Sequence, residues 1–287
     1  MNRLWPALVL SGIIFLGGCG REPVDLPNEI TTEVDGAEMV LVPKGEFLIG
    51  SLEGEGEERP EKKVWLPSFY IDKYAVTNAQ YAEFLKYIDT YGDAQVRCPF
   101  APEIVDYTPR YWDDDTLNAS DHPVVGVDYY CAWAYARWAK KRLLTEFEWE
   151  KAARGTDGRK YPWGNEEPDA DGNWRANYAR ESEGKQGDAS DGYARTAPVK
   201  AFPEGASPYG AIQMAGNVYE WTDTFFDPTY YARMPYKDPK GPPNSEYRTV
   251  RGGSWKWRAF HIRCSKRRKL QHRDRKSDLG FRLAKDP

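Results

Sequence analysis

Residues 248–276, which begin "RTVRGGSWKWRAFHIRCSKRRK", hold the side chains whose types and spacing best suit binding chemistry. This stretch has twelve Lys and Arg residues against one acid, Asp274. Aromatic rings interleave with the cations; rings stack on ligands, and guanidinium or ammonium groups bind anions. The pattern favours a binding surface for an acidic peptide or a sugar, and its candidate residues, referred to below as the predicted groove, are Ser254, Trp255, Trp257, Arg258 and His261. The alternative is a set of core aromatics whose neighbouring cations pair with acidic loops at 53–58 and 166–171.

The cysteines limit the metal and redox chemistry that this chain can perform. They are Cys19, Cys98, Cys131 and Cys264. No pair has the CxxC spacing, and the three histidines are scattered. Apart from Cys19, an odd number of thiols in an exported protein leaves one unpaired if a disulfide forms. One disulfide and three unreactive thiols are equally consistent with the sequence.

The start of the chain has the layout of a secretory signal peptide. Arg3 supplies positive charge, and the apolar run from Leu4 to Leu16 is too short to span a bilayer stably. The "LGGC" motif that ends at Cys19 resembles a bacterial lipobox. It predicts removal of residues 1–18 and attachment of lipid to Cys19. An ordinary signal peptide, or a buried helix with an incidental cysteine, is the alternative.

A lipid on Cys19 would hold the protein at a membrane surface of the bacterial cell envelope rather than across the membrane. Because no Asp directly follows the cysteine, the expected destination is the outer membrane, on its periplasmic or its surface face. Residues 19–36 are polar and include two prolines, so they are predicted to form a lipidated tether.

Composition indicates one rigid, loop-rich domain at residues 37–287. The 25 Gly and 21 Pro favour turns and loops, and the 11 Trp and 19 Tyr favour a rigid globular core. The formal net charge of −4 gives no general attraction for nucleic acid, so no such partner is expected. No internal repeat or second domain boundary is visible.

Local patterns predict strands at both ends of this domain and three helices between them. Thr77 or Asn78 caps the first helix, at 77–88, and the second covers residues 128–141. The third follows a capping box of Thr145 and Glu148 and ends at Gly155. Residues 156–199 show little periodicity, which is long for an irregular stretch in a compact domain, so something must order it.

Seven segments, in order, resemble the formylglycine-generating enzyme, or sulfatase-modifying factor, family. They are "MVLVPKGEFLIGS", "FYIDKYAVTNAQYAEFL", "HPVVGVDYYCAWAYARWAKKRLLTEFEWEKAARG", "YPWGNE", "TAPVKAFPEGASPYGAIQMAGNVYEWTDTFFD", "VRGGSW" and "DLGFRLA". They cover the chain from Met39 to Ala284. The resemblance implies an α/β fold of the α+β type, with little regular secondary structure and a distant likeness to C-type lectins.

The resemblance also implies structural calcium, which would order the irregular stretch. The first implied site uses the side chains of Asn177 and Asp191 and the main-chain carbonyls of Tyr178 and Tyr193. The second uses the side chains of Gln213 and Glu220 and the carbonyls of Gly216 and Val218. Calcium takes six to eight oxygen ligands, which loops can offer. The alternative is that Asn177 and Asp191 cap turns and that Glu220 pairs with a basic residue.

Copper is not expected, because the positions that the resemblance implies for it lack thiols. The family's enzymes oxidise a cysteine in a substrate peptide, using oxygen and copper(I) held by two cysteines. Counted from Ser254, the first lies three residues on and the second five further, where this chain has Trp257 and Ile262. Copper(I) is soft and needs thiolates, and Cys264 matches a different family position. The sequence therefore predicts no catalytic residue and no formylglycine-generating activity.

These features together favour a membrane-anchored binding, assembly or maturation module without the parent oxidase activity. Its expected partners are the membrane, through Cys19, and an envelope protein, peptide or glycan. One alternative is an oxidoreductase that matures proteins or peptides by non-cysteine chemistry, with His261 or an aromatic radical. Another is a purely structural lipoprotein.

Overall fold

The structure, a computed structural model, describes residues 26–181 and 188–287. The predicted signal peptide and Cys19 lie outside these residues. The strands are short: β1 Glu29–Thr31, β2 Glu38–Val42, β3 Gly45–Ile49, β4 Lys62–Leu66, β5 Phe69–Asp72, β6 Arg142–Leu143, β7 Tyr219–Phe225, β8 Tyr247–Arg251, β9 Arg268–Gln271, β10 Leu279–Gly280 and β11 Leu283–Lys285. The helices are α1 Asn78–Tyr91, α2 Tyr129–Trp138, α3 Glu146–Arg154 and α4 Tyr230–Arg233, with 3-10 turns η1 Gly56–Glu58, η2 Ala170–Gly172, η3 Pro203–Gly205 and η4 Ala259–Ile262.

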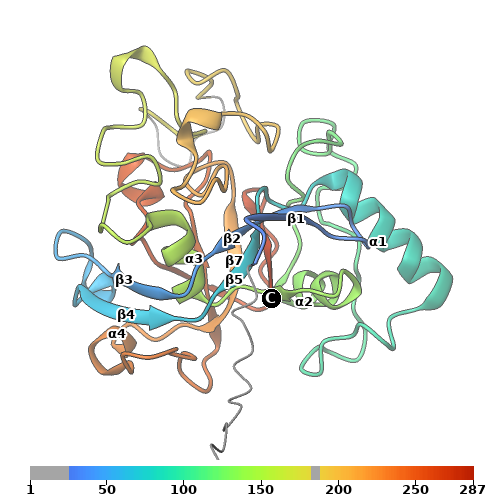
Figure 1. Cartoon of the computed structure of the whole chain (residues 1–287). Coiled ribbons are helices and arrows are strands. Elements are labelled where there is room, and N and C mark those ends of the chain that lie inside the picture. Colours follow the sequence, from blue (N-terminus) through green and yellow to red (C-terminus); the bar gives the residue numbers. More distant parts are fainter. Residues whose placement is uncertain (1–25, 182–187) are drawn as a thin grey trace, which may run out of the picture.

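The strands form two sheets and a hairpin. The first sheet has the order β1-β2-β5-β11-β6, the second has the order β10-β7-β8-β9, and β3 pairs with β4. α1 and α2 lie on one side of the central strands, whereas α3 and the β3–β4 hairpin lie on the other (Figure 1). This is the predicted mixed fold, with few helices and long loops.

The three predicted helices are present, and two of their caps have the predicted geometry. The Thr77 hydroxyl accepts a hydrogen bond from the Gln80 N–H at the start of α1. Thr145 and Glu148 form a reciprocal capping box at the start of α3, and Gly155 ends that helix. Such side chains satisfy N–H groups that have no partner inside the helix.

Two clusters of buried side chains join the helices to the sheets. Tyr135 of α2 packs in one cluster with Trp221 and Val250 of the second sheet. Trp149 of α3 packs in another with Phe69 of the first sheet. The long segment between α3 and β7 contains only the 3-10 turns η2 and η3 among its described residues, which agrees with the predicted lack of periodicity.

The domain begins before residue 37, inside the stretch that was predicted to be a tether. β1 pairs antiparallel with β2, and Ile30 lies opposite Met39. Asp35 is buried and ion-paired to Lys141 at 2.7 Å. The error has a physical cause: β1 is a short, polar edge strand, and its only large apolar residue gives no pattern to detect.

The described helices include none that is both long enough and apolar enough to span a bilayer.

Candidate functional site

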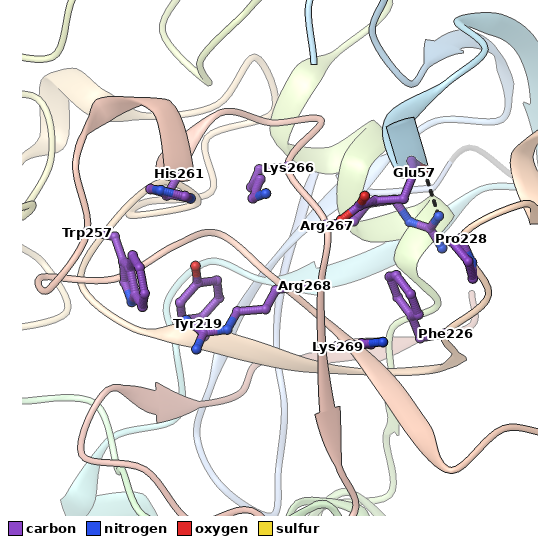
Figure 2. Close-up of a pocket in the computed structure, with 10 residues that line it drawn as sticks. All are labelled: Glu57, Tyr219, Phe226, Pro228, Trp257, His261, Lys266, Arg267, Arg268 and Lys269. Atoms are coloured by element: carbon purple, nitrogen blue, oxygen red, sulfur yellow. Dashed lines mark hydrogen bonds between the residues drawn. The ribbon is translucent and has the colours of Figure 1, made fainter. Parts of the chain in front are cut away.

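A pocket of about 420 Å³ lies where the second sheet meets the loop after β8. Figure 2 shows the side chains that surround it. Its lining residues are Glu57, Tyr219, Phe226, Pro228, Trp257, His261, Lys266, Arg267, Arg268 and Lys269. The pocket therefore draws on η1, β7, the loop that contains η4, and β9.

The turn after β8 places Trp257 and His261 beside the sheet. Gly253 has a φ of +70°, and a Cβ there would lie 2.6 Å from the His261 carbonyl oxygen. Only glycine fits this position without displacing the backbone. The chain then forms η4, and the Trp257 and His261 rings meet edge to face with their centroids 5.0 Å apart.

Aromatic rings hold the two cations of β9. The guanidinium of Arg268 lies 4.6 Å from the Trp257 ring centroid and 5.0 Å from that of Tyr219. The ammonium of Lys269 lies 4.9 Å from the Tyr247 ring and 5.7 Å from the Phe226 ring. Burial raises the pKa of Tyr219 to about 12, and Arg268 partly opposes that shift. Tyr219 thus remains a neutral phenol at neutral pH.

The other basic residues at the pocket are held by carboxylates. Arg267 donates to both oxygens of Glu146 at 2.8 Å, and both side chains are inaccessible to solvent. Lys266 pairs with Glu55 at 2.6 Å. Next to the pocket, Arg263 makes a two-pronged pair with Glu58. The predicted pairing with the 53–58 loop therefore holds for Lys266 and Arg263, whereas Arg267 pairs with Glu146 of α3 instead.

The pocket contains only part of the predicted groove. Trp257 and His261 line it. Ser254 is instead buried, where its hydroxyl donates to Asp278 at 2.7 Å, and Trp255 is also buried. Arg258 points elsewhere and donates to the Glu181 carbonyl at 3.2 Å. Spacing placed these residues on one segment but did not show which of them face outward.

Only Trp257 and His261, of the ten residues that line the pocket, were singled out from the sequence. Tyr219 and Phe226 come from β7 and the residue after it, far from the basic segment in sequence. Lys269 was counted among the cations but was not singled out. No local signal marks these residues, because the β7–β8–β9 pairing alone brings them together.

Asp191, from the first predicted calcium set, lies against the backbone of two other members of that set, Tyr178 and Tyr193. Its carboxylate is buried and accepts hydrogen bonds from the Tyr178 N–H at 3.1 Å and the Tyr193 N–H at 2.9 Å. Within the described residues it forms no ion pair, and burial raises its pKa to about 6. The neighbouring Asn177 amide donates to the Arg195 carbonyl at 2.7 Å. A buried carboxylate that has no counter-charge among the described residues and lies in a loop fits a hard cation.

The second predicted calcium set does not fit, because its side chains have other partners. Glu220 accepts from the Arg282 Nε at 2.8 and 2.9 Å and from the Trp149 Nε1 at 2.7 Å. Gln213 donates to the Pro198 and Ala201 carbonyls. Glu220 thus serves as the partner of a buried arginine, which was the alternative to the calcium prediction. The remaining members, Gly216 and Val218, lie in the turn before β7.

Asn217 holds the irregular stretch together, and the sequence analysis overlooked it. Its side chain bonds to both the N–H and the carbonyl of Ala197, at 3.0 and 3.1 Å. Its backbone N–H donates to the Asn177 carbonyl at 2.8 Å. Its φ of +60° is a conformation that Asn tolerates better than most residues. The Gly-Asn pair at 216–217 is the signal that would have found it.

The described cysteines are buried, free thiols outside the pocket. They are Cys98, Cys131 and Cys264. Burial raises the pKa of Cys264 to about 12, which keeps it protonated at neutral pH. At the positions compared with copper ligands, Trp257 lines the pocket, and Ile262 is fully buried in the core. The described residues contain no group of three or more His, Cys, Asp or Glu that is arranged to hold a metal.

The fold and pocket define a class: a single mixed α+β domain with little regular structure and a site built on loops beside a small sheet. Residues 25–287 match the sulfatase-modifying factor enzyme 1-like domain. The chain belongs to this family, as its sequence motifs predicted.

Relatives and solved structures agree with this assignment. The formylglycine-generating enzyme of Streptomyces coelicolor is 38% identical, and the alignment covers 86% of this chain and 88% of the relative. That of Thermomonospora curvata is 35% identical over 92% and 98% of the two chains. The structure of PvdO from Pseudomonas aeruginosa superposes with a TM-score of 0.71 at 28% identity, covering 92% of this chain and 100% of PvdO.

Proposed function

We propose that this protein is a binding module for assembly or maturation in the bacterial envelope, built on the sulfatase-modifying factor scaffold without its copper chemistry. The observation that carries the proposal is the composition of the pocket. Trp257 stands where the family resemblance implies the first copper thiolate, and it stacks with Arg268. A wall of rings and cations suits recognition of an anionic partner group rather than coordination of copper(I).

The rings and cations that line the pocket also indicate which class of partner it would bind. Stacking rings and charge-assisted hydrogen bonds would hold a segment of an envelope protein, a peptide or a glycan. The pocket volume of about 420 Å³ is within the range of small-ligand sites.

Metal content tests the absence of copper chemistry. We expect the purified full-length chain, incubated with copper(I) and a thiol reductant and then desalted, to retain far less than stoichiometric copper. A stoichiometric amount of copper or iron would contradict the proposal and favour an enzyme. The Trp257→Cys and Ile262→Cys double variant is the matched comparison. It supplies the two missing thiols, although the space left by the indole must be filled before they can converge.

Lipid on Cys19 would bring this module to the envelope membrane, as the LGGC motif predicts. We expect the Cys19→Ala variant to leave the membrane fraction for the soluble one. A variant that still sediments with membranes would place the anchor elsewhere.

Calcium is the structural cofactor that we propose, and it would be held at the first site only. Asn177, Asp191 and the carbonyls of Tyr178 and Tyr193 would hold it. When bound, it would offset the buried negative charge of Asp191 and fix the loops on either side.

An oxidoreductase is the second candidate function, and one observation favours it. The relatives with 35% and 38% identity over most of both chains are called formylglycine-generating enzymes. An enzyme of this kind would need chemistry that does not use thiolate-held copper. Stoichiometric iron in the metal analysis, or oxidation of a cysteine peptide, would support it.

A further inference from the structure

The pocket wraps around the outer edge of β9. This strand ends the sheet order β10-β7-β8-β9, so among the described strands none pairs with its outer side. Outside the ladder with β8, no described backbone–backbone hydrogen bond involves Arg268 or Lys269. Such an edge presents N–H and C=O groups that can pair with another extended chain.

Arg268 and Lys269 face the pocket from opposite sides of this edge. Successive side chains of a strand point to opposite faces of its sheet, yet both residues line one cavity. Figure 2 shows Arg268 extending toward Tyr219 and Lys269 extending away from it, on the Phe226 side. The cavity is therefore open to both faces of the sheet, and a ligand that fills it would lie along the strand.

These two cations differ from their neighbours in having no carboxylate partner. Within the described residues, Arg268 and Lys269 form no ion pair, whereas Lys266 and Arg267 pair with Glu55 and Glu146. One acid, Glu57, also lines the pocket. The rings around Arg268 and Lys269 hold their charges in place without neutralising them.

From these observations we propose the ligand class: an extended peptide segment of a partner protein with two consecutive acidic residues, paired along the free edge of β9. Adjacent residues of a paired strand face opposite sides, as Arg268 and Lys269 do. One carboxylate would reach Arg268 and the next would reach Lys269. The inference rests on the proposed binding function and deepens it.

Charged residues also occur on edge strands simply to prevent aggregation. The pocket goes beyond that role, because a protective charge needs neither a cavity nor flanking rings. An acidic glycan is the competing ligand. It has carboxylates but no backbone N–H and C=O in strand geometry, so it would not use the edge of β9.

Fluorescence anisotropy with labelled peptides tests the proposal on the purified full-length chain. The probe is a short peptide with two adjacent glutamates flanked by valine and threonine. A second peptide has the same composition but places a valine between the glutamates. A third has adjacent glutamates with an N-methyl group on the backbone nitrogen of the second glutamate. Oligogalacturonate serves as the acidic glycan competitor.

We expect the adjacent-glutamate peptide to bind, and the spaced and N-methylated peptides to bind about tenfold more weakly. Arg268→Gln and Lys269→Gln should each weaken binding by about tenfold, since each removes one charge-assisted hydrogen bond. The control is Arg273→Gln, which makes the same charge change on an exposed residue outside the pocket and should change affinity by less than about twofold. Unchanged urea midpoints would show that the variants remain folded.

Equal binding of the adjacent and spaced peptides, or Arg268→Gln binding like the parent, would overturn the proposal. Oligogalacturonate that binds more tightly than any peptide would replace it with an acidic glycan. Failure of every peptide to bind would also overturn it, and would leave the proposed function intact if the chain still held no copper. Stoichiometric copper would instead contradict the proposed function itself.

Discussion

Two groups of cations come from the same segment of the chain and lie in opposite surroundings. Arg251 and Arg267 are fully buried against the carboxylates of Glu150 and Glu146. Arg268 and the exposed Lys269 lie among aromatic rings at the pocket and have no carboxylate partner within the described residues. A count of charges along the sequence treats these groups alike, whereas their burial and partners separate a structural role from the binding role that we propose.

The difference follows from the cost of removing charge from water. A buried guanidinium is tolerated only when hydrogen bonds and an opposite charge compensate for lost hydration. The arginines of the first group therefore depend on acids from distant parts of the chain. A half-exposed cation keeps part of its hydration and can exchange the remainder for a ligand.

The largest expected effect comes from breaking a buried pair. Glu146→Ala leaves Arg267 buried without its partner, which should lower the free energy of unfolding by about 3–5 kcal/mol. Urea denaturation followed by tryptophan fluorescence measures this change.

The matched control is Glu83→Ala, which removes an acid from the exposed pair with Lys86 on α1. It should cost less than about 1 kcal/mol. Equal losses for the two variants would remove the distinction between buried and exposed charges on which the comparison depends.

The helices were predictable from sequence because their signals are local. Thr77 and Thr145 cap the helices that they precede, and Gly155 ends α3. The buried pairs were not predictable in this way. The partner of Glu220 is Arg282, and nothing in the motif around Glu220 indicates that contact.

The pocket was only partly predictable, because some of its residues come from one local segment and others depend on distant strand pairing. The basic, aromatic segment pointed to Trp257 and His261, which do line it. It also pointed to Ser254 and Trp255, which are buried, because spacing along a loop carries no information about which residues face outward. Tyr219 depends on strand pairing for its place, and sequence alone did not provide that pairing.

Calcium should have the next largest effect. Binding to the folded state alone raises stability by about 2.7 kcal/mol at a hundredfold excess over Kd. We expect the melting temperature to rise between chelator and millimolar calcium in the parent chain and to stay constant in Asp191→Asn. If the melting temperature of the parent chain is the same in chelator and in calcium, the proposed calcium site is wrong.

The pH dependence of stability gives a second test of the buried Asp191 carboxyl. Because the pKa of Asp191 is raised from 3.8 to about 6 in the folded state, its contribution to stability without calcium is fully present below pH 3.8 and is lost as pH rises through about 6. In chelator, the stability of the parent relative to Asp191→Asn should therefore fall across this range. The pKa of Asp72 is also raised to about 6, but its effect cancels in the difference.

The smallest expected effect on stability is that of Arg268→Gln. The side chain has no ion pair within the described residues and is partly exposed, so the variant loses mainly its ring contacts, which should cost about 1 kcal/mol or less. Urea denaturation of Arg268→Gln and of Glu146→Ala gives free energies of unfolding that compare the two groups of cations directly. A loss of several kcal/mol would show that Arg268 belongs with the structural arginines.

The central claim is that this family member binds without the parent oxidase chemistry. Its most direct test is mass spectrometry of a sulfatase-motif cysteine peptide after incubation with the protein, copper, oxygen and a thiol reductant. A formylglycine-generating enzyme serves as the positive control, and heat-treated protein serves as the blank. We expect the peptide mass to stay unchanged with this chain. Conversion of the cysteine to an aldehyde, absent from the blank, would contradict it and make the protein an enzyme.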